Sequence, residues 1–101
     1  MTEQESHFHK DMLNTCIIAK RELGYQPSRF MQLLSELGGV QAAKRLIAKE
    51  GETYGLEVLW RGGRLDLSVE AHVIKPEYQS LFTVEEIQRC HKILDDLGFL
   101  G

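Results

Sequence analysis

The chain is poor in the features that mark secreted, membrane-spanning or nucleic-acid-coating proteins. It contains two cysteines in 101 residues, too few for the disulfide framework of a small secreted domain. No apolar run approaches the ~20 residues of a membrane span, and the charged N-terminus lacks the apolar core of a signal peptide. A formal net charge of -3 gives no global positive field to attract nucleic acid or an anionic membrane. These absences predict a cytoplasmic protein with no membrane contact.

The composition that remains is that of an ordinary globular domain. Hydrophobic residues make up 43% of the chain and charged residues 27%, a usage typical of chains that fold. A length of 101 residues is enough for one hydrophobic core and too short for two. We therefore expect a single helical domain over residues 1–101.

Apolar residues recur every three or four positions along most of the chain, which is the period of amphipathic α-helices. The pattern predicts helices over residues 5–23, 28–37, 40–49 and 84–97, each with a glycine at or near its end. Thr83 and Glu86 have the spacing of a capping box, in which each side chain satisfies a free backbone donor at the helix start. The predicted fold class is all-α, a compact bundle of about four to six short helices.

The segment over residues 54–74 admits two interpretations. Apolar and polar residues alternate strictly over its second half, which is the period of a strand, and a hairpin over residues 56–73 would give an α+β fold. The alternative is two short helices, one with Thr53 as N-cap and one capped by Asp66 or Ser68. We favour the helices, because the chain offers no third strand to extend an isolated hairpin.

Three segments carry a specific sequence pattern. They are Leu59-Trp60, Gly63-Arg64-Leu65-Asp66-Leu67-Ser68-Val69-Glu70 and Leu81-Phe82-Thr83-Val84-Glu85-Glu86. In this pattern the chain resembles a small, largely uncharacterised bacterial domain family, and the similarity covers roughly residues 25–99. Such domains occur alone or beside larger bacterial proteins, some of which act on nucleic acid. The resemblance therefore implies a bacterial or phage-related intracellular setting and no particular activity.

No pattern of catalytic or metal-binding residues stands out. His7 and His9 would share a face only on an extended segment, and no CxxC or HxxxH spacing is present for zinc. Cys90 and His91 form an adjacent pair, but on a helix they point about 100° apart, with the cysteine on the apolar face. We therefore expect solvated terminal histidines, a core thiol beside a surface imidazole, and a protein that is not an enzyme and holds no metal or cofactor.

Trp60, Arg61 and Arg64 form the first candidate binding surface. Tryptophan and arginine are the residues most enriched at interface hot spots, so this cluster predicts a protein-binding site. The alternative is structural, with Trp60 in the core and Arg64 in a salt bridge to Asp66 or Glu70. The function that we predict is a non-enzymatic helical adaptor or regulatory module that binds a protein partner, or a second copy as a homodimer.

The second candidate surface is the helix pair over residues 27–49. A glycine turn between two short helices is typical of helix-turn-helix modules. The second of these helices would present Gln41, Lys44, Arg45 and Lys49, whose side chains can read base edges or pair with phosphates. A packed helix hairpin with a solvated basic face accounts for the same pattern. A small nucleic-acid-binding module is therefore the alternative function.

Overall fold

The computed structural model describes residues 2–48 and 54–99, and every regular element in these ranges is helical. In chain order the elements are α1 (Glu3–Leu23), α2 (Ser28–Leu37), α3 (Gly39–Ala48), α4 (Tyr54–Arg61), η1 (Leu65–Leu67), α5 (Val69–Val73), η2 (Pro76–Leu81) and α6 (Val84–Asp96). The two elements named η are 3₁₀ helices. The prediction of an all-α bundle is confirmed, and the hairpin considered for residues 56–73 is wrong. None of the helices in the described ranges is both long and apolar enough to cross a membrane.

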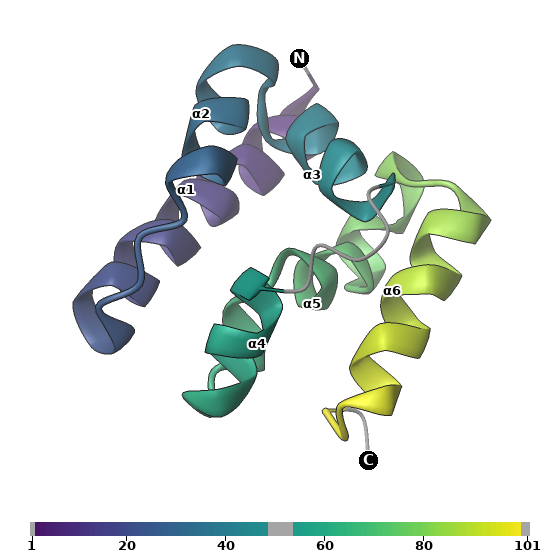
Figure 1. Cartoon of the computed structure of the whole chain (residues 1–101). Helices are drawn as coiled ribbons and strands as arrows, with labels where there is room; N and C mark the ends of the chain where they lie inside the picture. Colours follow the sequence, from purple (N-terminus) through teal and green to yellow (C-terminus); the bar gives the residue numbers. More distant parts are fainter. Residues whose placement is uncertain (1, 49–53, 100–101) are drawn as a thin grey trace.

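The helices form two groups that face each other (Figure 1). The first group consists of α1, α2 and α3, which all pack against one another. The second contains α5 and α6, which pack together, with α4 attached through η1. Contacts of α3 with α6, and of α1 with both 3₁₀ helices, join the two groups. Residues far apart in the sequence therefore meet where α3 packs against α6 and where α1 packs against the 3₁₀ helices.

The hydrophobic core is centred on the N-terminal half of α1. Phe8 is fully buried, and its ring packs edge-on against Tyr78 and Phe82, with ring centroids 5.1 and 5.2 Å away. A second, smaller apolar cluster holds α4 and η1 against the other half of α1; its buried members are Ala19, Leu59, Leu65 and Leu67. The two clusters fix both ends of α1 to the second group of helices.

Capping residues set the helix ends that the sequence predicts. Thr83 Oγ1 accepts a hydrogen bond from the Glu86 backbone N at 3.1 Å, and the Thr83 N donates to Glu86 Oε1 at 2.8 Å. The capping box is therefore confirmed. Gly24 ends α1 with a φ of 65°, a left-handed conformation that glycine adopts without strain. Ser68, one of two caps considered for α5, accepts from the Ala71 backbone N at 3.0 Å.

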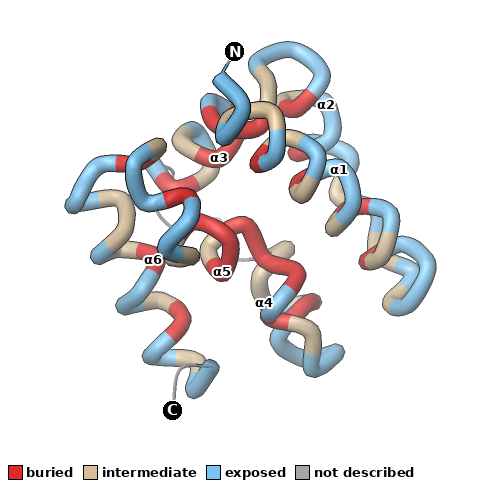
Figure 2. The backbone as a smooth tube through the Cα atoms, turned by 180° about the vertical axis from the view of Figure 1, so that it is seen from behind, coloured by how far each residue is buried: buried red, intermediate tan, exposed pale blue. Residues whose placement is uncertain are grey.

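The strand-like alternation over residues 65–73 does not separate a buried face from a solvated one, because the polar Ser68 and His72 are buried along with the apolar residues, as the largely red stretch in Figure 2 shows. Leu65 and Leu67 both reach the core from a single 3₁₀ turn. The polar His72 on α5 is only 6% exposed, and its Nδ1 lies 2.8 Å from the Ser68 carbonyl oxygen, to which it donates. Burial lowers the pKa of His72. A helix without a solvated face cannot show an amphipathic period.

Glu86 also ties α6 to α3. Its Oε1 accepts a hydrogen bond from Lys44 Nζ at 2.7 Å, in addition to the one from Thr83, and Lys44 lies 5.2 Å from the centroid of the Phe82 ring. Partial desolvation opposes ionisation, but the hydrogen bonds from Lys44 and Thr83 prevail and lower the pKa of Glu86. This carboxylate therefore stabilises both a helix start and a contact between the two groups of helices.

We expect Glu86→Ala to lower the free energy of unfolding by about 1–3 kcal/mol, because it removes a helix cap and a charge-assisted hydrogen bond together. Glu86→Gln should cost less, since the amide oxygen still accepts from Thr83. Urea denaturation measures both changes, and Glu85→Ala, at an exposed position in the same turn, is the matched control. Equal losses for Glu85→Ala and Glu86→Ala would contradict the role given to the Lys44 contact.

Candidate functional site

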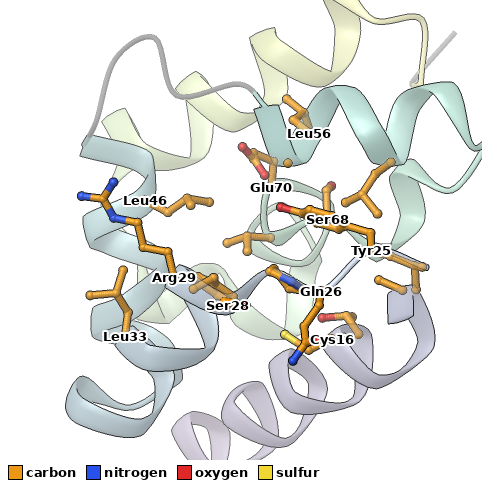
Figure 3. Close-up of a pocket in the computed structure, with 18 of the residues that line it drawn as sticks. Cys16, Tyr25, Gln26, Ser28, Arg29, Leu33, Leu46, Leu56, Ser68 and Glu70 are labelled. Carbon is orange, nitrogen blue, oxygen red and sulfur yellow. The ribbon is translucent and has the colours of Figure 1, made fainter. Parts of the chain in front are cut away.

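A pocket of about 730 Å³ opens between the two groups of helices, with walls from α1, α2, α3, α4 and α5 (Figure 3). Cavities that hold small molecules have volumes of about 300–1,000 Å³ and mainly apolar walls. The apolar part of this wall is formed mainly by Phe30, Leu33, Leu46, Leu56 and Leu59. The pocket therefore has the size and the lining of a ligand site.

Among the described residues, Glu70 is the acidic one that lines the pocket. Figure 3 shows its carboxylate between Leu46 and Leu56, directed into the open space. None of the ion pairs formed among the described residues includes Glu70. Burial raises the pKa of Glu70, and a hydrogen bond from its own backbone N–H opposes this only in part. The pocket thus contains a partly buried carboxyl group that forms no ion pair with the cations of the described ranges.

Arg29 and Arg45 line the same pocket, from α2 and α3. Both residues are exposed, and in Figure 3 the Arg29 guanidinium is directed away from Glu70. The thiol of Cys16 lies in the opposite wall, where burial raises its pKa to about 11. This thiol is therefore protonated at neutral pH and is a poor nucleophile. The pocket has an acidic interior, a basic rim and no reactive thiolate.

The structure separates Arg64 from Trp60 and Arg61, the other two residues of the first predicted surface. Trp60 is 48% exposed, so the alternative that placed it in the core is wrong. Arg61 is also exposed and pairs with Glu57, with 2.6 Å between Nη2 and Oε1. Arg64 is held away from them, because its Nε donates to Asp66 at 3.1 Å and its Nη1 pairs with Glu22. The expected salt bridge of Arg64 is thus confirmed with Asp66.

Trp60 and the pocket share one face of α4. Leu56 lies one helical turn before Trp60, and residues at i and i+4 project from the same side of a helix. Leu56 lines the pocket, so the apolar wall continues along α4 to the exposed indole. Within the pocket wall, the Tyr25 hydroxyl approaches α4 so closely that a Cβ built on Gly55 would lie 2.7 Å from it. The α4 surface, defined as Leu56, Trp60 and Arg61, thus borders the pocket.

The second predicted surface is only partly available. Gln41 and Arg45 are exposed, but Lys44 is bound to Glu86, and Lys49 lies outside the described residues. Gly38 alone separates α2 from α3, whereas the turn of a helix-turn-helix has 3–4 residues. Arg45, moreover, is one of the residues that line the pocket.

The remaining candidates concern cysteine and histidine. Cys90 is fully buried, with its pKa raised to about 12 mainly by desolvation, and His91 is exposed, so the prediction of a core thiol beside a surface imidazole is confirmed. His7 is exposed as expected, but the expectation is wrong for His9, which packs against Gly39 and has its Nδ1 buried without a hydrogen-bond partner. Within the described ranges, no three His, Cys, Asp or Glu side chains come together as metal ligands.

Sequence reasoning missed the pocket and the role of Glu70, which it considered only as a partner for Arg64. One signal was available, because Glu70 is a charged residue between two apolar ones, Val69 and Ala71.

Comparisons of the chain with protein-family models, curated proteins and solved structures found no match. Function is therefore inferred from the pocket and the α4 surface.

Proposed function

We propose that this protein is a non-enzymatic, cytoplasmic adaptor or regulatory module that binds a partner protein through the α4 surface. The observation that carries the proposal is the half-exposed Trp60, one helical turn from a residue that lines the pocket. Large aromatic side chains exposed beside a concave apolar surface are typical of interface hot spots. Arg61, exposed next to Trp60, adds the second residue type enriched at such sites.

The packing of α4 supports this role. Among residues 55–61, Leu59 is buried, whereas Glu57, Trp60 and Arg61 are exposed and can contact a partner. The Arg61–Glu57 pair is exposed on the same helix and contributes little to stability, which leaves both charges available at an interface rim. The raised pKa values of Cys16 and Cys90 favour a binding role over nucleophilic catalysis.

We expect Trp60→Ala to weaken partner binding at least ~10-fold, because truncation of a hot-spot tryptophan costs about 2 kcal/mol or more. Stability should change little, since half of the side chain is already in solvent. The measurement is quantitative mass spectrometry of the proteins retained from a bacterial lysate by the immobilised chain. Ile17→Ala, a truncation on α1 of a side chain that is 61% exposed, is the matched control.

The proposal requires a protein that the wild type and Ile17→Ala retain equally and that Trp60→Ala loses. If Trp60→Ala retains the same proteins as the wild type, the α4 surface is not the binding site. Light scattering tests for a second copy as partner, because a homodimer formed by this surface dissociates in the Trp60→Ala variant. If the retained component is nucleic acid, with an affinity that falls steeply with salt, the nucleic-acid alternative replaces this function.

A further inference from the structure

The pocket has a chemical feature that partner docking on α4 does not use. Glu70 places a carboxylate in a mainly apolar cavity, and no cation among the described residues lies within ion-pair distance of it. Burial of an ionised carboxylate without a partner costs free energy. A ligand that brings a positive group to this carboxylate removes that cost, so the partly desolvated Glu70 is already prepared for a cation.

The shape of the pocket favours a small molecule over a protein segment. Five helices contribute to its walls, and its volume of about 730 Å³ lies within the range of about 300–1,000 Å³ that holds drug-sized ligands. A single lysine or arginine side chain of a partner would leave most of this space unfilled. The apolar side chains of Leu33, Leu46 and Leu56 offer a hydrocarbon surface that a larger ligand body can cover.

We propose that the pocket binds a small organic cation with an apolar body, whose ammonium group pairs with Glu70 and whose hydrocarbon part packs between Leu46 and Leu56. Arg29 and Arg45 do not prevent this. Both are exposed at the rim, where solvent and salt screen their repulsion, and the Arg29 guanidinium points away from Glu70. The attraction by Glu70 acts in a less polar interior and is screened less. This site goes beyond partner binding on α4 and does not depend on it.

Binding of this kind is linked to protonation. An ammonium ligand pairs only with the ionised carboxylate, so it must displace the proton of Glu70 wherever the carboxyl group is still protonated. Affinity therefore rises with pH as Glu70 ionises. Cys16, Tyr25, Arg29 and Arg45 line the pocket with Glu70. Cys90 of α6, which packs against α5, interacts electrostatically with Glu70. The pKa values of about 11 for Cys16 and about 12 for Cys90 keep both thiols neutral below pH 8.

The test compares three probes that share one apolar body and differ in head group: 4-phenylbutylammonium, 4-phenylbutanol and 4-phenylbutyrate. Binding to the full chain is followed by amide chemical shifts of the residues around Leu46 and Leu56, between pH 5 and pH 8. We expect the ammonium probe to bind at least ~10-fold more tightly than the alcohol at pH 8, and this advantage to shrink as the pH falls. The carboxylate probe should bind most weakly.

Glu70→Gln should remove the advantage of the ammonium probe and its pH dependence while leaving the alcohol unaffected. Glu57→Gln, which neutralises an exposed carboxylate of α4 outside the pocket, should behave like the wild type. Equal affinities for ammonium and alcohol in the wild type would overturn the proposal, as would an unchanged preference in Glu70→Gln. N-acetyl-lysine methylamide binding as tightly as 4-phenylbutylammonium would reassign the pocket to a partner's side chain and also overturn it. Failure of the α4 proposal in the Trp60→Ala experiment would change none of these outcomes, because the probes test the pocket alone.

Discussion

Replacing Phe8 with alanine is expected to lower the free energy of unfolding by about 3–5 kcal/mol, the range measured for buried phenylalanines. The side chain is fully buried, and α1 meets η2 around it. Truncation removes apolar surface from the core and leaves a cavity that the surrounding helices fill only in part. It also removes two edge-on ring contacts, with Tyr78 and Phe82. Phe8 therefore stabilises the junction between the two groups of helices.

Chemical denaturation followed by circular dichroism measures this loss. Leu13→Ala is the matched control, because Leu13 lies on the same helix but is 42% exposed. Its truncation should change the free energy of unfolding by less than about 1 kcal/mol, as is usual for surface positions. If the two variants are destabilised equally, α1 does not pack against η2 as described.

The parts of the fold that the sequence predicts are those that local interactions decide. The capping box of Thr83 and Glu86 and the left-handed Gly24 each act within one helical turn, so their sequence signals are complete. The same holds for Ser68, which caps α5 from one residue before its first turn. Helix class and most helix limits therefore follow from the sequence.

Tertiary packing decides the parts that the sequence leaves open. Residues 65–73 alternate like a strand, yet they form a 3₁₀ turn and a helix, and their polar Ser68 and His72 are buried together with the apolar residues. No local pattern distinguishes a buried helix from a buried strand of this length. The η2 helix was not predicted either, since its short turn carries no amphipathic period.

The candidate site depends even more on tertiary structure. Trp60 was identified from its residue type, but its exposure follows from how α4 packs, which the sequence does not reveal. The sequence offers Asp66 and Glu70 as ion-pair partners for Arg64. In the structure Arg64 pairs with Asp66, and Glu70 has no cation partner among the described residues. The walls of the pocket come from helices spread over most of the chain. A cavity of this kind has no sequence period and is visible only in the folded chain.

The position of α4 links the two proposed sites. Its Leu56 lines the pocket, and Trp60 lies on the same face one turn later. A ligand between Leu46 and Leu56 therefore contacts the helix that presents the partner-binding tryptophan. The pocket also depends on α3, since Arg45 and Leu46 belong to that helix, and the placement of α3 against α1 is thus decisive for the pocket.

The second large effect is expected at Gly39, where α3 begins against α1. A Cβ at this position would lie 2.7 Å from the His9 Cα and 3.1 Å from the His9 N, so the backbone of one helix must move. We expect Gly39→Ala to cost about 1–3 kcal/mol of unfolding free energy, the usual range for overpacking. Helix propensity alone favours alanine over glycine by about 1 kcal/mol. A loss of unfolding free energy therefore indicates the clash with His9, and a gain indicates that it is absent.

Thermal and urea denaturation measure the change, with Gln41→Ala, at an exposed position of the same helix, as the control that should shift stability by less than about 0.5 kcal/mol. A gain in stability for Gly39→Ala would mean that α1 and α3 are farther apart than described, since helix propensity would then prevail over the clash with His9. A loss confirms the close approach. Because α3 carries Leu46 and Arg45, the same displacement should also weaken the binding of 4-phenylbutylammonium in the pocket.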